Sequence, residues 1–215
     1  MKVERTDIVA SSRQPIVRLV GNGPVAEDRS QEIDGTEVVV RFNNAAGFGT
    51  VNGTRTTHLF LINCGGQARE WLANPGFVDR ASVRTSGEIL LPIHPAKDDH
   101  YLPPLSAAER GEPDARNHAA DMVSMLERSD KAVTVLSPEI FLKACRIIGY
   151  ERPERGMAAP STGLIALVWA LQTFDMPIAV SGFSFEGWPG HRWEAERAFF
   201  EAQRDEGRLR LGGPA

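Results

Sequence analysis

Short apolar runs that alternate with segments of helical pattern constrain the fold of this chain more than any other feature. The runs contain little polar alternation, as expected of strands that are covered on both faces. Because helical segments separate most of them, we expect an α/β fold, a mostly parallel sheet flanked by helices. Sheets of this kind bind ligands at the carboxyl ends of their strands. The expected strands are residues 15–20, 36–42, 57–62, 88–93, 132–136, 177–181 and 209–211.

Signals for helix starts and for one irregular segment complete this outline. Ser137 followed by Pro138 predicts a helix that begins there and runs to about residue 148. Residues 97–117 contain aspartate, proline and glycine at positions that break long elements, which predicts a loop or lid with a short helix. We expect residues 1–215 to form one domain that carries this lid. Further helices are expected over residues 117–128, 164–174 and 191–206.

Composition narrows the class of protein. The net charge of -4 does not favour a non-specific nucleic-acid binder. Cys64 and Cys145 leave room for one bridge, but two free thiols in a reducing compartment is the simpler interpretation. The first 14 residues lack a signal-peptide core, and the longest apolar run, residues 164–171, is too short to span a bilayer. We therefore expect a cytoplasmic protein.

Two motifs follow the first two expected strands. Gly21, Asn22 and Gly23 form a turn in which a ligand could approach the backbone and the next helix could offer N–H groups to a phosphate. The dinucleotide fingerprint is incomplete, so a tight strand-to-helix turn explains the same residues. Asn43 and Asn44 could recognise ribose or a base edge, or could form a turn, which we favour for Asn44.

Residues 53–58 and 161–163 are rich in hydrogen-bond donors. The first group precedes the third expected strand, and turns made by its hydroxyl side chains are the alternative to a ligand site. Ser161, Thr162 and Gly163 open an apolar helix, where backbone N–H groups and hydroxyls could bind an anion. By itself this pattern favours a plain helix cap.

His191 lies in a glycine- and proline-containing loop at the start of the last expected helix. A side chain there can project into a cleft, and a histidine near its normal pKa is the best general base at neutral pH. A surface histidine is the alternative. Glu194 and Glu196 suit the helix dipole without further function.

The order of these motifs is more specific than any one of them. Val-Gly-Asn-Gly, Glu-Ile-Asp-Gly, Val-Val-Arg-Phe-Asn-Asn and Gly-Thr-Arg-Thr-Thr-His, within residues 16–63, resemble the large sialylmotif of glycosyltransferase family 29. Within residues 155–211, Pro-Ser-Thr-Gly-Leu-Ile-Ala-Leu, a strand and Ser-Gly-Phe are similar to its small sialylmotif. His191 with Glu196 matches its very small motif, His-x-x-x-x-Glu.

The resemblance implies a modified Rossmann-like fold that uses CMP-sialic acid without a metal or other cofactor. It also implies inverting transfer, in which His191 takes the proton of an acceptor hydroxyl that attacks C2 of the sugar. Backbone N–H groups and hydroxyls at helix N-termini would stabilise the negative charge on the phosphate of the leaving CMP. CMP-Kdo, which has the same anomeric carboxylate, is an alternative donor. The resemblance places the donor contacts at Asn22, Gly23, Asn43, Ser161, Thr162 and Gly163.

The chain departs from the family pattern at several positions. Val17 and Phe174 stand where secretory members have bridged cysteines, which agrees with a cytoplasmic enzyme. Ala159 stands where the family often has a phosphate-binding tyrosine, and Tyr101 of the lid could replace it. The segment before His191 is shortened, and its third motif is reduced to Glu-Gly-Trp.

Three functions remain open at this stage. The first is transfer to a glycan or glycolipid, with no nucleic-acid partner and with peripheral association at the inner membrane face where the acceptor is a lipid. The second is a CMP-binding module without transfer activity. The third is a dehydrogenase, which needs an acidic residue at the end of the second strand, where this chain has Arg41, Phe42 and Asn43.

Overall fold

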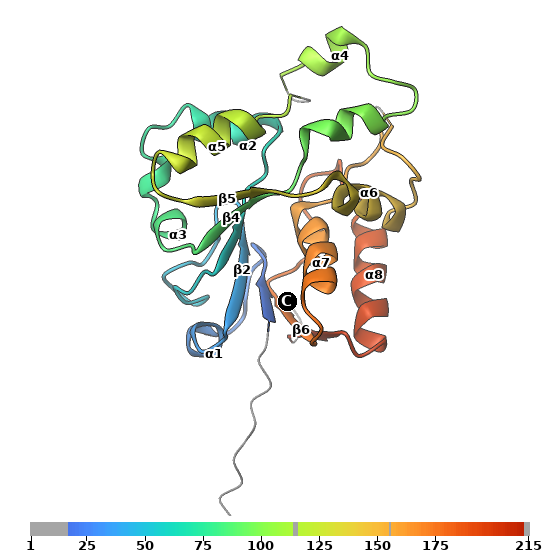
Figure 1. Cartoon of the computed structure of the whole chain (residues 1–215). Coiled ribbons are helices and arrows are strands. Elements are labelled where there is room, and N and C mark those ends of the chain that lie inside the picture. Colours follow the sequence, from blue (N-terminus) through green and yellow to red (C-terminus); the bar gives the residue numbers. More distant parts are fainter. Residues whose placement is uncertain (1–16, 114–115, 155, 213–215) are drawn as a thin grey trace, which may run out of the picture.

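One seven-stranded parallel sheet organises the chain (Figure 1). A computed structural model of the protein describes residues 17–113, 116–154 and 156–212. The strand order is β5-β4-β3-β2-β1-β6-β7, and every neighbouring pair is parallel. The strands are β1 (Val17–Val20), β2 (Val38–Phe42), β3 (His58–Phe60), β4 (Glu88–Leu91), β5 (Ala132–Val135), β6 (Ile178–Ser181) and β7 (Leu209–Leu211).

Successive strands are added first on one side of β1 and then on its other side. Strands β2 to β5 extend the sheet on one side of β1, and the chain then returns to place β6 on the other side. Val17 pairs with Val38 of β2 and with Ile178 of β6. The carboxyl ends of β1 and β6 therefore meet at the switch point where open α/β sheets bind ligands.

Helices cover both faces of the sheet, as the alternating pattern predicts (Figure 1). None of the helices in the described ranges is long and apolar enough to cross a membrane. One face carries α6 (Pro138–Ile147), α7 (Thr162–Thr173) and α8 (Trp193–Asp205), and the other carries α2 (Gly65–Leu72), α3 (Ala81–Arg84) and α5 (Ala119–Glu127). Shorter elements are α1 (Ser30–Asp34), α4 (Ala107–Gly111) and the 3-10 turns η1 (Phe77–Asp79) and η2 (Pro95–His100).

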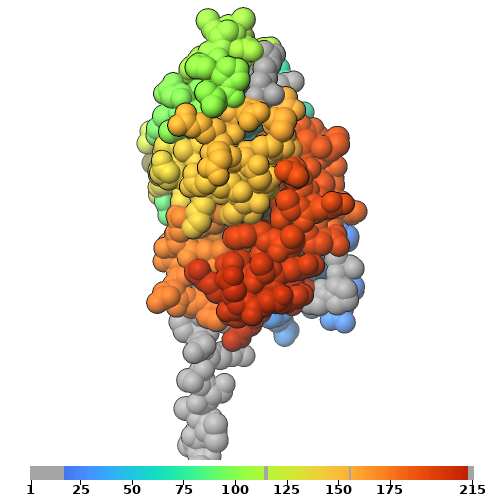
Figure 2. Space-filling view, turned by 90° about the vertical axis from the view of Figure 1, so that its right-hand side faces the viewer, coloured from blue at the N-terminus to red at the C-terminus, as the bar shows by residue number. Residues whose placement is uncertain are grey.

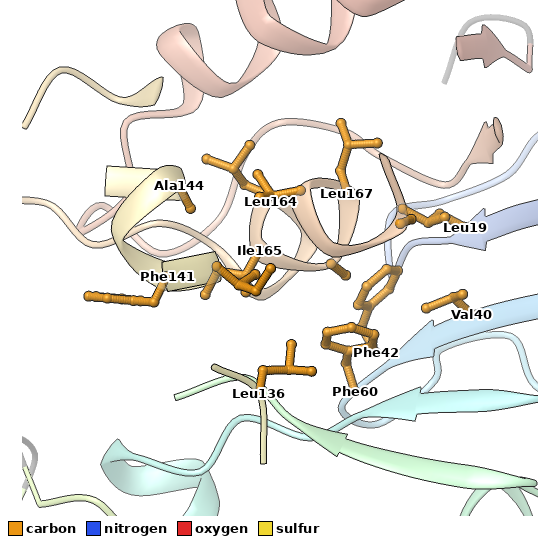
Figure 3. Close-up of a cluster of buried hydrophobic side chains, with 14 of the residues drawn as sticks. Leu19, Val40, Phe42, Phe60, Leu136, Phe141, Ala144, Leu164, Ile165 and Leu167 are labelled. Carbon is orange, nitrogen blue, oxygen red and sulfur yellow. The ribbon is translucent and has the colours of Figure 1, made fainter. Parts of the chain in front are cut away.

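Helix α7 is the centre of the larger core. Its Leu164, Ile165 and Leu167 are fully buried and lie between α6 and the sheet (Figure 3). Each buried side chain of this size stabilises the fold by about 1.5–3 kcal/mol. Because α7 is packed against both α6 and the sheet, it is apolar on all sides. The same packing fixes the position of its first turn relative to the strand ends.

The structure differs from the sequence prediction in two stretches. The helix expected directly after the glycine turn begins only at Ser30 and has five residues, so residues 21–29 form a loop. Helices α2 and α3 were not expected, because residues 65–84 carry no regular apolar pattern. Residues 15–16 of the first expected strand and residues 114–115 of the expected lid lie outside the described residues.

The lid region protrudes at one end of the molecule (Figure 2). It contains η2 and α4, and Ser106 caps α4 with a capping box. Asp98 lies 3.0 Å from the Nζ of the buried Lys97, with 15% of its side chain exposed. A buried ammonium needs a compensating charge, which explains the position of this carboxylate. The neighbouring Asp99 is exposed.

Asn63 ties both ends of the lid region to the end of β3. Its Nδ2 donates to the carbonyl of Ile93 at 2.7 Å, and its Oδ1 accepts from the N–H of Ile93 at 3.0 Å. The N–H of His118 donates to the carbonyl of Asn63 at 2.8 Å. The side chain and the backbone carbonyl of Asn63 therefore anchor the two ends of this segment, and Asn117 Nδ2 supports them by donating to the Ile93 carbonyl at 2.9 Å.

Replacing Asn63 by Ala leaves the buried N–H of Ile93 without its partner, while the carbonyl of Ile93 keeps the bond from Asn117 Nδ2. We expect the free energy of unfolding, measured by urea denaturation, to fall by about 2–4 kcal/mol. Asn74→Ala is the matched control, because Asn74 accepts one exposed bond from Gly76. Equal losses in the two variants would contradict the anchoring role of Asn63.

Candidate active site

The glycines after β1 allow its loop to pack closely on the loop after β6. The N–H of Gly21 donates to Ser181 and that of Gly23 donates to Gly182, each at 2.8 Å. A Cβ on Gly21 would lie 2.1 Å from the Gly182 carbonyl oxygen. The need for glycine at position 21 is thus explained by loop packing at the switch point.

Asn22 and Asn43 connect the loops that follow β1, β2 and β3. Asn22 donates to the carbonyl of Phe42 at 3.2 Å and accepts from the N–H of Ala46 at 2.8 Å. Asn43 has a φ of 50° and accepts from the N–H of Ile62 at 2.9 Å. Both side chains therefore lie at the carboxyl edge of neighbouring strands, and both hold that edge together.

Ser161 is the N-cap of α7, as its pattern favoured. Its Oγ accepts from the N–H of Leu164 at 3.1 Å. The same hydroxyl donates to Glu196 Oε2 at 2.5 Å, and the N–H of Ser161 donates to Glu196 Oε1 at 2.8 Å. A carboxylate of α8 thereby fixes the first residue before α7.

Glu196 is the residue whose role the sequence understated. Its side chain is buried, with 1% exposed, so the helix dipole alone does not explain it. Burial raises the pKa of Glu196, while the two hydrogen bonds from Ser161 act in the opposite direction. Glu194, by contrast, is exposed and fits the simple dipole interpretation.

The first turn of α7 presents free backbone donors. The N–H groups of Thr162 and Gly163 form no hydrogen bond with any residue in the described ranges. A Cβ on Gly163 would lie 2.7 Å from the Cε1 atom of Phe183, so only glycine fits between α7 and the loop after β6. This turn can accept a negative charge from a ligand.

His191 lies two residues before α8, beside the segment that leads into α7. Its Nδ1 is 2.7 Å from the carbonyl oxygen of Ala159, and the N–H of Ala159 donates to Gly190 at 2.9 Å. A carbonyl oxygen only accepts, so Nδ1 carries the proton and the neutral ring keeps a lone pair on Nε2. Burial lowers the pKa of His191, and the bond to Ala159 opposes this. The imidazole is thus neutral near pH 7.

Two indoles flank this imidazole. The ring centroids of Trp188 and Trp193 lie 4.9 Å and 4.8 Å from that of His191, both at steep angles. The Nε1 of Trp193 donates to the carbonyl of Trp188 at 3.1 Å. The shortened segment before His191 therefore forms an ordered aromatic cluster.

Residues 53–58 do not join this site, because they lead into β3 and include its first residue, so they lie at the amino ends of the strands. Asp34 accepts from the N–H groups of Thr54 and Arg55 at 2.8 Å and 2.7 Å. The carbonyl of Arg55 accepts from Nε of the buried Arg41 at 3.0 Å. Burial lowers the pKa of Arg41 to about 10. This loop encloses Arg41 and is held together by hydrogen bonds.

Two other expectations concern Asn44 and Tyr101. Asn44 accepts from Arg80 at 2.9 Å, which agrees with its structural interpretation. The ring of Tyr101 lies 5.2 Å from Nζ of Lys97.

A cavity of about 1100 Å³ lies beside the loop after β6, where Gly182, Phe183 and residues of α8 line it. Its lining includes neither His191 nor the predicted donor residues.

Comparison with known proteins places this geometry in a family. The residue pattern of the family described as "Glycosyltransferase family 29 (sialyltransferase)" matches residues 17–205. The "Urease operon 23 kDa accessory protein" of Rhizobium meliloti (strain 1021) is 28% identical over 210 residues, which cover 91% of each chain.

Two solved structures share the fold. A crystal structure of a mammalian sialyltransferase superposes with a TM-score of 0.55 at 16% identity, covering 94% of this chain and 70% of that one. A mammalian sialyltransferase in complex with Gal-beta-1-3GalNAc-ortho-nitrophenol gives a TM-score of 0.51 at 17% identity, covering 93% and 70%. The parallel α/β fold with helices on both faces, together with the family match, shows that this chain belongs to glycosyltransferase family 29, the sialyltransferase family.

Proposed function

We propose that this protein transfers a sialic-acid-type sugar from a CMP-activated donor to a hydroxyl group of a glycan. Family membership supports glycosyltransferase activity in general. The observation that carries the finer proposal is the 2.7 Å contact between His191 Nδ1 and the Ala159 carbonyl, which leaves Nε2 as a proton acceptor. The donor is CMP-sialic acid, with CMP-Kdo as the alternative.

The donor phosphate would lie at the first turn of α7. The free N–H groups of Thr162 and Gly163 offer two donors there, and Ser161 is fixed by Glu196 rather than left mobile. The positive end of the helix dipole adds to this attraction. These contacts strengthen as charge develops on the leaving phosphate, so they favour the transition state.

The remaining donor contacts would come from the loops after β1 and β2. Asn22 and Asn43 each retain amide N–H capacity beyond the bonds that hold the strand ends together. Gly23 packs closely on the loop after β6, where a Cβ would lie 2.9 Å from the Gly182 carbonyl oxygen, and this packing holds the first loop beside the strand ends. We assign these three residues to the nucleotide half of the donor.

In the reaction, His191 Nε2 takes the proton of the acceptor hydroxyl while its oxygen attacks C2 of the sugar acid. The bond from C2 to the phosphate oxygen breaks, and its electron pair leaves with CMP. Attack opposite the leaving group inverts the configuration at C2. His191 is suited to this step because its ring is neutral, partly buried and held by Ala159.

The transfer proposal is tested by incubating the protein with CMP-sialic acid, and separately with CMP-Kdo, in the presence of simple glycosides. Release of CMP that depends on the glycoside supports transfer.

A second candidate, a nucleotide-binding accessory protein, is favoured by the name of the Rhizobium relative and by Ala159. It predicts CMP binding without turnover of either donor.

The rate of transfer should depend on pH through His191. The base acts in its neutral form, and burial lowers its pKa below the ordinary 6.5. We therefore expect kcat/KM to be level at neutral pH and to fall as pH drops through a midpoint below 6.5. A profile with its acid limb centred above that value would point to a different base.

A single cytoplasmic domain over residues 1–215, with residues 97–117 as a lid, completes the proposal. Cys64 and Cys145 are both free, and Val17 and Phe174 occupy the positions of the bridged cysteines of secretory relatives. Reducing conditions would suit such a chain. Peripheral binding at the inner membrane face would follow where the acceptor is a lipid-linked glycan.

A further inference from the structure

The cavity beside the loop after β6 has no part in the proposed transfer, because its lining includes neither His191 nor any residue that we assign to the donor. Its volume of about 1100 Å³ is at the upper end of the range for small-molecule sites. The loop after β1, the loop after β6, the end of β7 and one face of α8 border it. A ligand in this cavity would therefore be bound apart from the CMP-activated sugar.

Arg29 is the charged residue of this lining that is least exposed to water. It is half-buried, whereas every other charged residue of the lining is exposed. Its guanidinium forms no hydrogen bond and no ion pair with any residue in the described ranges. Gly212 lets this group lie against the end of β7, since a Cβ there would be 2.4 Å from Arg29 Nη1. A guanidinium that is partly removed from water without a carboxylate favours an anionic ligand.

Arg197 of α8 lines the same cavity and is held by the loop after β6. Its Cζ lies 5.4 Å from the centroid of the Phe185 ring, and its Nη2 donates to the carbonyl of Ser184 at 3.4 Å. No carboxylate of the described residues pairs with it. The aromatic ring therefore orients the guanidinium while most of its N–H donors stay available to a ligand.

The other charged groups of the lining leave these two cations unpaired. Glu27, Glu186 and Glu201 are exposed, so water solvates their carboxylates and salt screens their field. The third arginine of the lining, Arg204, has a carboxylate of its own, because its Nη2 lies 2.9 Å from Asp205 Oδ1. The cavity thus presents two guanidiniums, one from the first loop and one from α8, that are free to bind an anion.

We propose that this cavity is a second ligand site, which binds the phosphate group of a small organic phosphate monoester through Arg29 and Arg197. Such a group carries about −1.5 to −2 charges at pH 7, which matches two cations, whereas a carboxylate carries one. Guanidinium forks also fit the oxygen atoms of a phosphate group. Val25, Phe183 and Leu211 line the cavity as well and offer apolar surface to the organic part of the ligand. The inference goes beyond the transfer reaction and does not depend on it.

The test is calorimetric titration with phenyl phosphate, inorganic phosphate and benzoate at neutral pH and constant ionic strength. An excess of CMP is present in every titration, so that the proposed donor site at α7 is filled. The wild type is compared with Arg29→Ala and Arg197→Ala. Arg210→Ala is the matched control, because it removes an exposed arginine of β7 that is not part of the cavity lining. Thermal unfolding of each variant checks that the fold is kept.

We expect the wild type to bind one phenyl phosphate per chain, and to bind inorganic phosphate and benzoate more weakly. The apolar lining explains the first difference and the charge of the ligand explains the second. Arg29→Ala and Arg197→Ala should each weaken phenyl phosphate binding by about tenfold to a hundredfold, the usual loss for a hydrogen-bonded charged group. Arg210→Ala should stay within about twofold of the wild type, and all three variants should keep the wild-type affinity for CMP.

Four results would overturn the inference. A folded protein that does not bind phenyl phosphate beside CMP has no second site. An equal loss in Arg210→Ala would reduce the effect to the net charge of the protein. Benzoate that binds as tightly as phenyl phosphate would contradict the preference for a phosphate group. A matching loss of CMP affinity in Arg29→Ala would make the cavity part of the nucleotide site.

Discussion

Replacing His191 by Ala should lower the rate of transfer by roughly 100- to 10,000-fold, the usual contribution of a general base. The dissociation constant of CMP should stay within about twofold, because the proposal assigns the imidazole to the acceptor hydroxyl and the phosphate contacts to Thr162 and Gly163. Transfer is measured by CMP release and binding by calorimetry.

A second histidine provides the control for this change. His100 lies in η2 of the lid region and takes part in none of the contacts of the proposed site. His100→Ala should therefore retain wild-type transfer. Full activity in His191→Ala would show that another group removes the acceptor proton.

Replacing Glu196 by Ala should damage both stability and function. Ser161 is 8% exposed, so its N–H and hydroxyl would lose two bonds in a site that water reaches poorly. We expect the free energy of unfolding to fall by about 2–4 kcal/mol. We also expect weaker CMP binding, because the start of α7 loses the contact that fixes it.

Two further variants separate this positioning role from a general effect of charge. Glu196→Gln keeps the shape and one carbonyl acceptor for Ser161, so it should restore part of the stability and part of the CMP affinity. Glu194→Ala removes an exposed carboxylate from the same helix turn and should change the free energy of unfolding by less than about 0.5 kcal/mol. Similar losses at Glu194 and Glu196 would argue for a simple dipole effect.

The architecture was predictable because its signals are local. Central parallel strands are buried on both faces, so β1, β2 and β3 appear as apolar runs in the sequence. Ser137 and Ser161 mark helix starts through bonds that span two or three residues. Helix α2 was missed because only Ala68 and Trp71 are buried along it.

The internal chemistry of the site depends on contacts between distant residues. Ser161 and Glu196 are 35 positions apart, and Asn22 meets the loop after β2 more than 20 positions away. From the sequence alone, Ser161 is explained as a helix cap, Glu196 as a partner of the helix dipole and Asn22 as part of a turn. None of these local explanations requires a contact with a distant residue. Only the order of the motifs, through the family resemblance, assigned these distant residues to one site.

The most direct test of the account is calorimetric titration of the purified protein with CMP, with UMP, AMP and NAD as controls. The proposed site at the start of α7 predicts that CMP binds and that the three controls bind at least about tenfold more weakly, a difference of about 1.4 kcal/mol. A folded protein that shows no preference for CMP would contradict the donor site, and with it the proposed transfer.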